Sequence, residues 1–336
     1  MSDLITVFCV ILSFFLIALP GLLTYGNESS LIVFYLNKKL PRLIIIFWIF
    51  LLAILLANYH GIMSIRGLGS IYEQRSLGKA SSLLLGYAQT YFGYVLSVAL
   101  IALGLFNRRI FLVALGWSGC LILYAITAER TIFLLPVLLF FVYKLACYKK
   151  QFLLLFIFLA MSSLYFDFIA LYGDSSKLTK DVGFYYLTRV VATPGLFYIN
   201  YQDYFREVGY TYFSHIKGFN LFIDVPVNFK VDPLYPELGR IVARDVHHIN
   251  SNSNASFLST DGVASLGNFG VVLVSIFMSL VLFFLNIMSS RWPKKFVLPL
   301  MAPIALLLTN GSLFTALISF GLLFWILIFS IMGRKF

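Results

Sequence analysis

The sequence has few charged residues. Lysine, arginine, aspartate and glutamate together make up 12% of its 336 residues, whereas hydrophobic residues make up 60%. Soluble globular chains carry about 25% charged residues. This scarcity of charge excludes an ordinary soluble protein and indicates a chain whose surface faces lipid.

The sequence also has little cysteine and no histidine pair at a metal-binding spacing. Cys9, Cys120 and Cys147 lie in or at the ends of apolar runs, so we expect small apolar side chains there and no disulfides. His247 and His248 are adjacent, whereas a two-histidine metal site is typically spaced H-x-x-x-H. We therefore expect no metal and no cofactor.

Long apolar runs occupy most of the chain. A helix of about 20 apolar residues crosses a hydrocarbon core, and the absence of period-2 alternation favours helices over a barrel. We predict an all-α, polytopic membrane protein with about nine or ten transmembrane helices, because segment 31–37 is too short to cross alone. The predicted spans are 4–25, 42–58, 83–104, 110–127, 131–146, 152–171, 268–288, 296–309 and 311–332.

The short loops predict the orientation. If the spans alternate in direction, 13 basic residues fall on one side with no acidic residue among them, and such a side is cytoplasmic. These basic residues are Lys38, Lys39, Arg42, Arg108, Arg109, Lys144, Lys149, Lys150, Arg291, Lys294, Lys295, Arg334 and Lys335. The net charge of +11 is thus a topology signal rather than a nucleic-acid surface. The C-terminus is expected inside. Met1 lies outside with nine spans, or inside if the chain bends at Pro20-Gly21 and 31–37 completes a pair.

One long polar loop interrupts the apolar pattern. We divide a single integrated membrane domain into an N-terminal bundle (1–171), an outer loop (172–267) and C-terminal helices (268–336). Within the loop, segment 182–201 is amphipathic and aromatic, as expected of a helix at the membrane surface. The loop holds three of the four histidines, so we expect the candidate site there.

Arginines on the predicted outer side are candidates for binding an anionic group. Arg189 follows an aromatic run, and Arg130 begins a span at its outer end, so each is placed to bind a phosphate whose lipid tail stays in the membrane. Arg66 and Arg75 are further candidates. For most other charged residues on this side we expect solvated ion pairs.

Histidine and neutral polar residues supply the rest of the candidate site. His247, His248 and His215 are candidates for a general base or a hydrogen-bond donor. The sequence at 250–270 adds Asn252, Asn254 and Asp261, which suit sugar hydroxyls, and glycines that permit close packing. A helix cap at Asp261 with glycines for packing is an equally good interpretation.

Three segments resemble the O-antigen polymerases, which are Wzy-type polymerases of oligosaccharide repeat units. They are AERTIFLLP at 128–136, TRVVATPG-x-x-YINYQDYF at 188–205, and NSNASFLSTDGVASLGNFG at 252–270, which continues directly into a span. The long outward loop late in the chain also resembles this family.

The resemblance implies a glycosyltransferase of the bacterial inner membrane that acts at the periplasmic face, where the long loop lies. It implies transfer of a growing glycan from undecaprenyl diphosphate to a sugar hydroxyl of a new lipid-linked repeat unit, without a metal. The implied partners are these lipid-linked substrates, membrane lipid, and a chain-length regulator and flippase of the same pathway. Within this framework Arg189, His248, His247 and Asp261 are catalytic candidates, and Arg130, Arg66, Arg75, Asn252, Asn254 and His215 are substrate-binding candidates.

Three alternatives stay open from the sequence. One is a structural or assembly protein without activity, against which the clustered arginine, histidine and asparagine residues argue. An O-antigen ligase would share the recognition of diphosphate and differ in its acceptor. A flippase or transporter would show internal repeats and charged or broken helices near the midplane. The long polar loop fits an enzyme better than a transporter.

Overall fold

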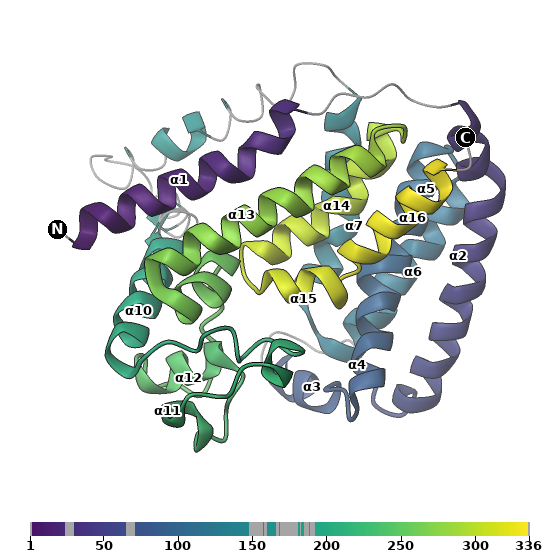
Figure 1. Cartoon of the computed structure of the whole chain (residues 1–336). Helices are drawn as coiled ribbons and strands as arrows, with labels where there is room; N and C mark the ends of the chain where they lie inside the picture. Colours follow the sequence, from purple (N-terminus) through teal and green to yellow (C-terminus); the bar gives the residue numbers. More distant parts are fainter. Residues whose placement is uncertain are drawn as a thin grey trace. The chain divides into compact units, whose positions relative to one another are not determined.

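The computed structural model describes residues 2–23, 30–64, 71–147 and 192–334, together with isolated positions between 157 and 188. The chain is 78% helical, and no strand occurs among the described residues (Figure 1). The all-helical prediction is confirmed. Predicted span 152–171 lies largely outside the described residues.

Five helical stretches are long and apolar enough to cross a membrane. They are Leu4–Gly21, Lys39–Tyr59, Leu83–Phe106, Ile110–Thr127 and Leu258–Ser289. These helices support an integral membrane protein. Each overlaps a predicted span, and α6 (Ile110–Thr127) has the predicted bounds.

The chain forms two compact units. The first comprises Met1–Leu23, Lys150–Phe283 and Leu307–Phe314, and the second comprises Thr24–Lys149, Phe284–Leu306 and Thr315–Phe336. Helices of the first unit are α1 (Ser2–Leu23), α10 (Thr193–Val208), η4 (Phe219–Leu221), α11 (Val227–Lys230), α12 (Leu238–Asp245), η5 (Leu258–Val263) and most of α13 (Ala264–Ser289). Helices of the second are α2 (Ser30–Tyr59), α3 (Ile71–Leu77), α4 (Leu83–Thr90), η2 (Tyr91–Ser97), α5 (Val98–Phe106), α6, α7 (Arg130–Ala146), most of α14 (Lys294–Leu308) and α16 (Leu322–Arg334). The short helix α15 (Leu313–Ile318) joins the two.

The second unit is built around the stretch formed by α4, η2 and α5. Residues from Phe92 to Leu103 are almost all buried there, because α2, α6 and α7 pack around this stretch. Gly116 and Gly119 of α6 permit close approach, since a Cβ atom at either position would collide with Ser97. The indole of Trp48 donates a hydrogen bond to the Ser97 hydroxyl (2.9 Å). Small residues and one buried hydrogen bond thus hold the bundle together.

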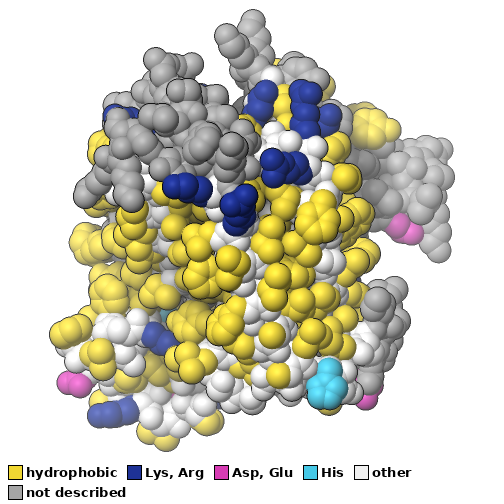
Figure 2. All heavy atoms as spheres, turned by 90° about the vertical axis from the view of Figure 1, so that its right-hand side faces the viewer, with side chains coloured by type: hydrophobic (Ala, Val, Ile, Leu, Met, Phe, Trp, Pro, Cys, Tyr) yellow, Lys and Arg dark blue, Asp and Glu magenta, His cyan; other side chains and the backbone are white. Residues whose placement is uncertain are grey.

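Basic side chains gather at one end of the second unit's helices. On the face shown in Figure 2, most lysine and arginine side chains lie at one end of a broad belt of hydrophobic side chains. The exposed basic residues of the described part of this unit include Lys39, Arg42, Arg108, Arg109, Lys144, Arg291, Lys294 and Lys295. Helix α2 begins before Lys39, so the apolar segment 31–37 extends a single helix through Pro41 instead of forming a separate element.

In the first unit, α1 is tied to α10 and α13 by a small polar junction. The Gln202 amide donates to the Thr6 hydroxyl (2.8 Å), and the Asn268 amide donates to the same hydroxyl (3.1 Å). Thr6 therefore connects three helices that are far apart in the sequence.

One helix breaks just before a predicted span and another predicted span is interrupted. Helix α13 contains non-helical backbone at Leu266 and Gly267, so its continuous apolar part begins at residue 268, where the sequence predicted it. The predicted span 311–332 is split into α15 and α16, with Gly321 at φ +75° between them. At that break Tyr91 donates a hydrogen bond to the carbonyl of Ile318 (2.9 Å).

Candidate functional site

The polar segment at 252–270 folds back on itself before it enters the span. Gly267 takes φ +62°, a conformation that glycine adopts without strain, and the chain reverses there. A Cβ atom on Gly270 would lie 2.2 Å from the Gly262 carbonyl oxygen. The backbone of η5 therefore lies directly against the start of the span, and glycine is required at this contact. The predicted close packing by Gly262 and Gly270 is confirmed.

The break leaves helix carbonyls that need other partners. The backbone N–H of Thr211 donates to the carbonyl of Ala264 (2.9 Å), and that of Tyr212 donates to the carbonyl of Ser265 (3.1 Å). A broken helix has carbonyls without intrahelical donors, and here the preceding loop supplies them. Tyr212 and Phe213 take positive φ (51° and 67°), which is strained for these residue types. The two hydrogen bonds to Ala264 and Ser265 hold residues 211–215 against η5 despite this strain.

Asp261 is the central acid of this arrangement. Its side chain is fully buried, and Oδ2 accepts the backbone N–H of Leu313 at the start of α15 (2.5 Å). The carboxylate thus does cap a helix, as one interpretation of the sequence held, but the helix is α15 rather than its own. Oδ1 has no hydrogen-bond partner within the described part of the chain.

His215 faces the free oxygen of Asp261. Its Nε2 lies 3.9 Å from Oδ1, and only 7% of the side chain is exposed. Nδ1 lies 2.8 Å from the Thr211 hydroxyl, which donates to the Ala264 carbonyl (3.0 Å). The imidazole tautomer sets whether Nδ1 or the Thr211 hydroxyl is the donor in that hydrogen bond. Nε2 is directed at the carboxylate, so both nitrogens face inward.

Several buried polar atoms of these segments have no hydrogen-bond partner among the described residues. They are Nε2 of His215, Oδ1 of Asp261 and the hydroxyls of Ser259 and Ser265. Native proteins pair nearly all such groups, so unpaired ones identify candidate positions for water or a ligand group. Of these atoms, Nε2 of His215 and Oδ1 of Asp261 face each other at 3.9 Å.

Tyr201 of α10 completes the buried surroundings. Its hydroxyl donates to the carbonyl of Ser253 (3.1 Å), and α10 packs against η5. Burial, and secondarily the negative charge of Asp261, raises the pKa of the Tyr201 phenol above its usual range. The phenol is therefore a permanent hydrogen-bond donor that anchors the polar segment.

A separate ion-pair network stabilises the surface between α10 and α12. Arg244 donates two hydrogen bonds to Asp232 (3.0 and 2.7 Å) and two to Asp245 (2.5 and 3.0 Å), and Tyr204 donates to Asp245 (2.8 Å). Hydrogen bonds from Arg244 lower the pKa values of both carboxyl groups. Because two acids already neutralise Arg244, this arginine is not available to bind an anion, as expected for most charges of the loop.

The remaining predicted loop residues lie at the surface of the first unit. The Asn200 amide donates to Nε2 of His247 (3.2 Å), and the Phe197 ring packs edge-on against the imidazole. His248 is exposed and takes φ +54°. Asn252 and Asn254 are exposed, and the Asn252 side chain also packs against Gly239. Residues 247–254 thus present two imidazoles and two amides on one short surface segment.

Two of the four predicted arginines lie within the described residues, and both belong to the second unit. Nε of Arg75 donates to the carbonyl of Ala128 (3.4 Å), two residues before the exposed Arg130 at the start of α7. Arg66 and Arg189 lie outside the described residues. Asp261 and His215 are the two predicted site residues that the structure brings together.

The sequence analysis missed Thr211, Tyr201 and Ser265, whereas Ser259 belongs to the predicted set of hydrogen-bonding residues beside Asp261. Ser265 is a small hydroxyl residue four positions after Asp261, and this spacing could have marked it. Thr211 and Tyr201 carried no local signal, because only the fold brings them to η5.

Among the residues that the structure describes, no group of three histidine, cysteine or acidic side chains could hold a metal ion. No protein-family model, no curated protein and no solved structure matches this chain.

Proposed function

We propose that the protein is a membrane glycosyltransferase of the O-antigen polymerase type, which joins lipid-linked oligosaccharide repeat units. The observation that carries the proposal is the construction of segment 252–270. This stretch resembles the family most clearly. Its Asp261 is buried beside His215 at a helix break, and its exposed Asn252 and Asn254 closely follow His247 and His248 in the chain. A polar site at the start of an apolar helix suits a substrate with a sugar head and a lipid tail.

In this reaction an acceptor sugar hydroxyl attacks the anomeric carbon of the donor glycan. A new carbon–oxygen bond forms, the bond from that carbon to the diphosphate oxygen breaks, and its electron pair leaves with the polyprenyl diphosphate. The hydroxyl proton passes to a base. His248 is exposed and suits this role, while His247, fixed by Asn200, presents Nδ1–H to a sugar or phosphate oxygen. Asn252 and Asn254 would orient the sugar.

Asp261 and His215 act in this proposal as positioning residues. Their polar atoms face each other and the protein interior, so they do not contact a substrate at the surface. They hold the helix break, and through Thr211 they hold the loop against it. The leaving diphosphate needs cations, for which Arg189, Arg130, Arg66 and Arg75 remain our candidates.

We assign the basic end of the second unit to the cytoplasm by the positive-inside rule. The opposite ends of its helices, with Arg130 and Arg75, would then face the periplasm of a bacterial inner membrane.

Deleting the gene in its bacterial host tests this proposal. Loss of ladder-like polysaccharide with a single repeat unit retained supports a polymerase. Loss of ligated polymer with lipid-linked polymer retained indicates the ligase instead. His248→Asn should lower polymer yield about 100-fold at unchanged protein level if it is the base, and wild-type yield would remove it from the site.

A flippase or transporter is the second candidate, and the helix breaks favour it. Transporters place binding sites at discontinuous helices and buried ionisable residues. The breaks at Leu266–Gly267 and before Gly321, with Asp261 buried beside the first, fit that pattern. A deletion strain that exposes no repeat unit on its surface, and accumulates it inside, would favour a flippase or transporter over a polymerase.

A further inference from the structure

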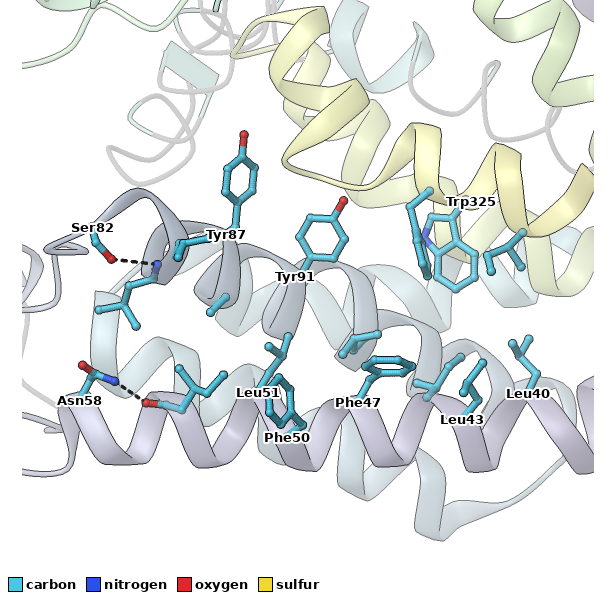
Figure 3. Close-up of a pocket in the computed structure, with 18 of the residues that line it drawn as sticks. Leu40, Leu43, Phe47, Phe50, Leu51, Asn58, Ser82, Tyr87, Tyr91 and Trp325 are labelled. Carbon is cyan, nitrogen blue, oxygen red and sulfur yellow. Dashed lines mark hydrogen bonds between the residues drawn. The ribbon is translucent and has the colours of Figure 1, made fainter. Parts of the chain in front are cut away.

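The second unit contains a long apolar groove that the proposed site does not use. It has a volume of about 830 Å³ and runs along α2 from Leu40 to Asn58. Its opposite wall is formed by α4 and η2, and Phe324, Trp325 and Ile328 of α16 close one end (Figure 3). Ligand sites typically enclose about 300–1,000 Å³, so the groove has the size of a binding site rather than a packing defect.

The groove is open along its side. Its floor contains buried side chains such as Ile44, Leu85 and Trp325. Its rim contains apolar side chains that are exposed, with Phe50 at 60% and Leu84 at 81%. Since α2 and the α4–α5 stretch are both long enough to span a membrane, the open side faces lipid. A hydrocarbon chain can therefore enter from the bilayer without crossing water.

The length of the groove identifies the kind of chain. Leu40 and Asn58 are separated by 18 helical residues, which corresponds to about 27 Å along the axis. The hydrocarbon core of a bilayer is about 30 Å thick, so an acyl chain of one leaflet reaches only about half that depth. A groove of nearly the full thickness fits a chain longer than one leaflet, such as a polyprenyl chain.

The two ends of the groove differ in polarity. At one end the lining includes Asn58, Ser81 and Ser82 (Figure 3). At the other end, near Leu40 and Leu43, the lining is apolar apart from the indole of Trp325. Exposed basic residues flank both ends, with Lys79 near Ser81 and with Lys39 and Arg42 beside Leu40. The hydrogen-bonding side chains of the lining would therefore meet the head of an amphiphile at the Asn58 end, with its tail toward Leu40.

We propose that this groove binds the hydrocarbon chain of a polyprenyl diphosphate lipid, with its head at the Asn58 and Ser82 end. The full-thickness length and the single polar end carry the assignment of the chain. The identification of the head group as a diphosphate rests on the proposed function. The groove holds the lipid that carries the glycan, so the head stays at the membrane surface during transfer.

Photo-crosslinking tests the groove. The full-length protein is placed in vesicles of phosphatidylethanolamine and phosphatidylglycerol with a polyprenyl diphosphate that bears a diazirine in its chain. We expect labelled peptides from α2 and α16. Unlabelled polyprenyl diphosphate should compete, whereas farnesyl diphosphate and added phosphatidylglycerol should not. Equal competition by phosphatidylglycerol, or labelling spread equally over exposed apolar residues of α1, would overturn the proposal.

Two filling variants and a matched control locate the site. Leu51→Trp enlarges a side chain in the groove, and Leu84→Trp does so at its exposed rim, where folding tolerates a larger side chain. Each should reduce labelling about tenfold, which corresponds to about 1.4 kcal/mol of binding. Ile46→Trp makes the same kind of change on an exposed position of α2 outside the groove and should leave labelling unchanged. Unchanged labelling in both filling variants would overturn the proposal.

The readout separates this proposal from the proposed function. Crosslinking requires no turnover, so a labelled groove in a protein that makes no polymer from authentic repeat units would reject the polymerase and keep the lipid site. Polymer formation with unaltered labelling in the filling variants would reject the groove and keep the polymerase.

Discussion

Two fully buried polar residues, Gln74 in the second unit and Asp261 in the first, differ in how many of their hydrogen bonds are made. Gln74 in the second unit is fully buried, accepts a hydrogen bond from Ser64 and donates to the carbonyls of Ile62, Ala125 and Ile126. Asp261 in the first unit is equally buried, but one of its oxygens has no hydrogen-bond partner in the described chain. A saturated polar group acts as a structural tie, whereas an unsaturated one keeps a capacity for chemistry.

The irregular helical segments η2 and η5 differ in the same way. In the second unit, Ser97 lies in the π-helical η2. Its hydroxyl donates to the Phe92 carbonyl (2.7 Å) and accepts from Trp48, so both hydrogen-bonding roles of this side chain are filled. In the first unit, η5 includes Ser259 and Asp261 and is followed by Ser265, and all three keep unpaired atoms. Irregular helix geometry thus stabilises one unit and builds a candidate site in the other.

The largest expected effect breaks the geometry of the first unit. Gly270→Ala places a Cβ atom 2.2 Å from the Gly262 carbonyl, and backbone cannot move aside as a side chain can. We expect the free energy of unfolding to fall by about 3 kcal/mol, measured by thermal unfolding in detergent. Gly195→Ala in α10 is the control, because a Cβ atom there meets nothing within 4 Å. Equal stability of the two variants would show that η5 does not pack against the span.

The second prediction sharpens the contrast between Gln74 and Asp261. Gln74→Leu leaves several buried carbonyls without donors, so we expect a loss of about 2–3 kcal/mol. Asp261→Asn keeps the shape and can still accept the Leu313 N–H, so its loss should stay below about 1 kcal/mol.

Polymer yield also distinguishes Asp261 from Gln74. Asp261→Asn should lower polymer yield because its amide holds His215 differently, whereas Gln74→Leu should change yield only in proportion to protein level. Wild-type yield for Asp261→Asn, measured at matched protein level, would make Asp261 a structural residue like Gln74.

The third prediction concerns acid pH. Arg244 lowers the pKa values of Asp232 and Asp245 in the folded protein, so the stabilisation is complete above their unfolded values of about 4 and is lost as pH falls through the folded values. Because the Arg244 side chain is 44% exposed, water screens the pair, and Arg244→Met should cost only about 1 kcal/mol at pH 7.

The pH dependence itself is the check on that prediction. The difference in melting temperature between wild type and Arg244→Met should shrink as pH falls below about 4. Arg240→Met, which removes the ion pair with Glu237, serves as the weaker control. A difference that does not vary with pH would mean that packing of the arginine stem, and not charge, stabilises this surface.

The smallest expected effect tests the anchor of the polar segment. Tyr201→Phe removes the hydrogen bond to the Ser253 carbonyl and should lower the free energy of unfolding by about 1 kcal/mol. Tyr204→Phe, which loses an exposed bond to Asp245, should cost less. If Tyr204→Phe lowered the melting temperature more than Tyr201→Phe, the exposed bond to Asp245 would be the more important of the two.

Much of the fold was predictable because a helix in lipid needs a long apolar run, and polar residues mark the ends of that run. Helix α6 matches its prediction at both ends, since Arg109 and the Ala128-Glu129 pair mark the limits of an apolar run. The start of the continuous part of α13 at residue 268 also agrees, because Gly267 signals the break. The split between α15 and α16 was missed, since the residues around Gly321 remain apolar and hydropathy does not detect a turn.

The candidate site was predictable only in part. Asp261, the histidines and the asparagines stood out as polar residues in an apolar chain. Their grouping did not, because His215 reaches Asp261 through the strained turn at Tyr212 and Phe213, which carry no signal of positive φ.

The sequence by itself determined that this chain is helical and apolar enough to span a membrane, and it predicted that 13 of its 25 basic residues fall on one side. Those properties follow from the free energy of transferring each residue between water and hydrocarbon. Only the tertiary structure decided that Asp261 caps α15 and faces His215, that Arg244 is neutralised by two acids, and that α2, α4, η2 and α16 enclose a groove. These depend on contacts between residues far apart in the chain, which no local pattern encodes.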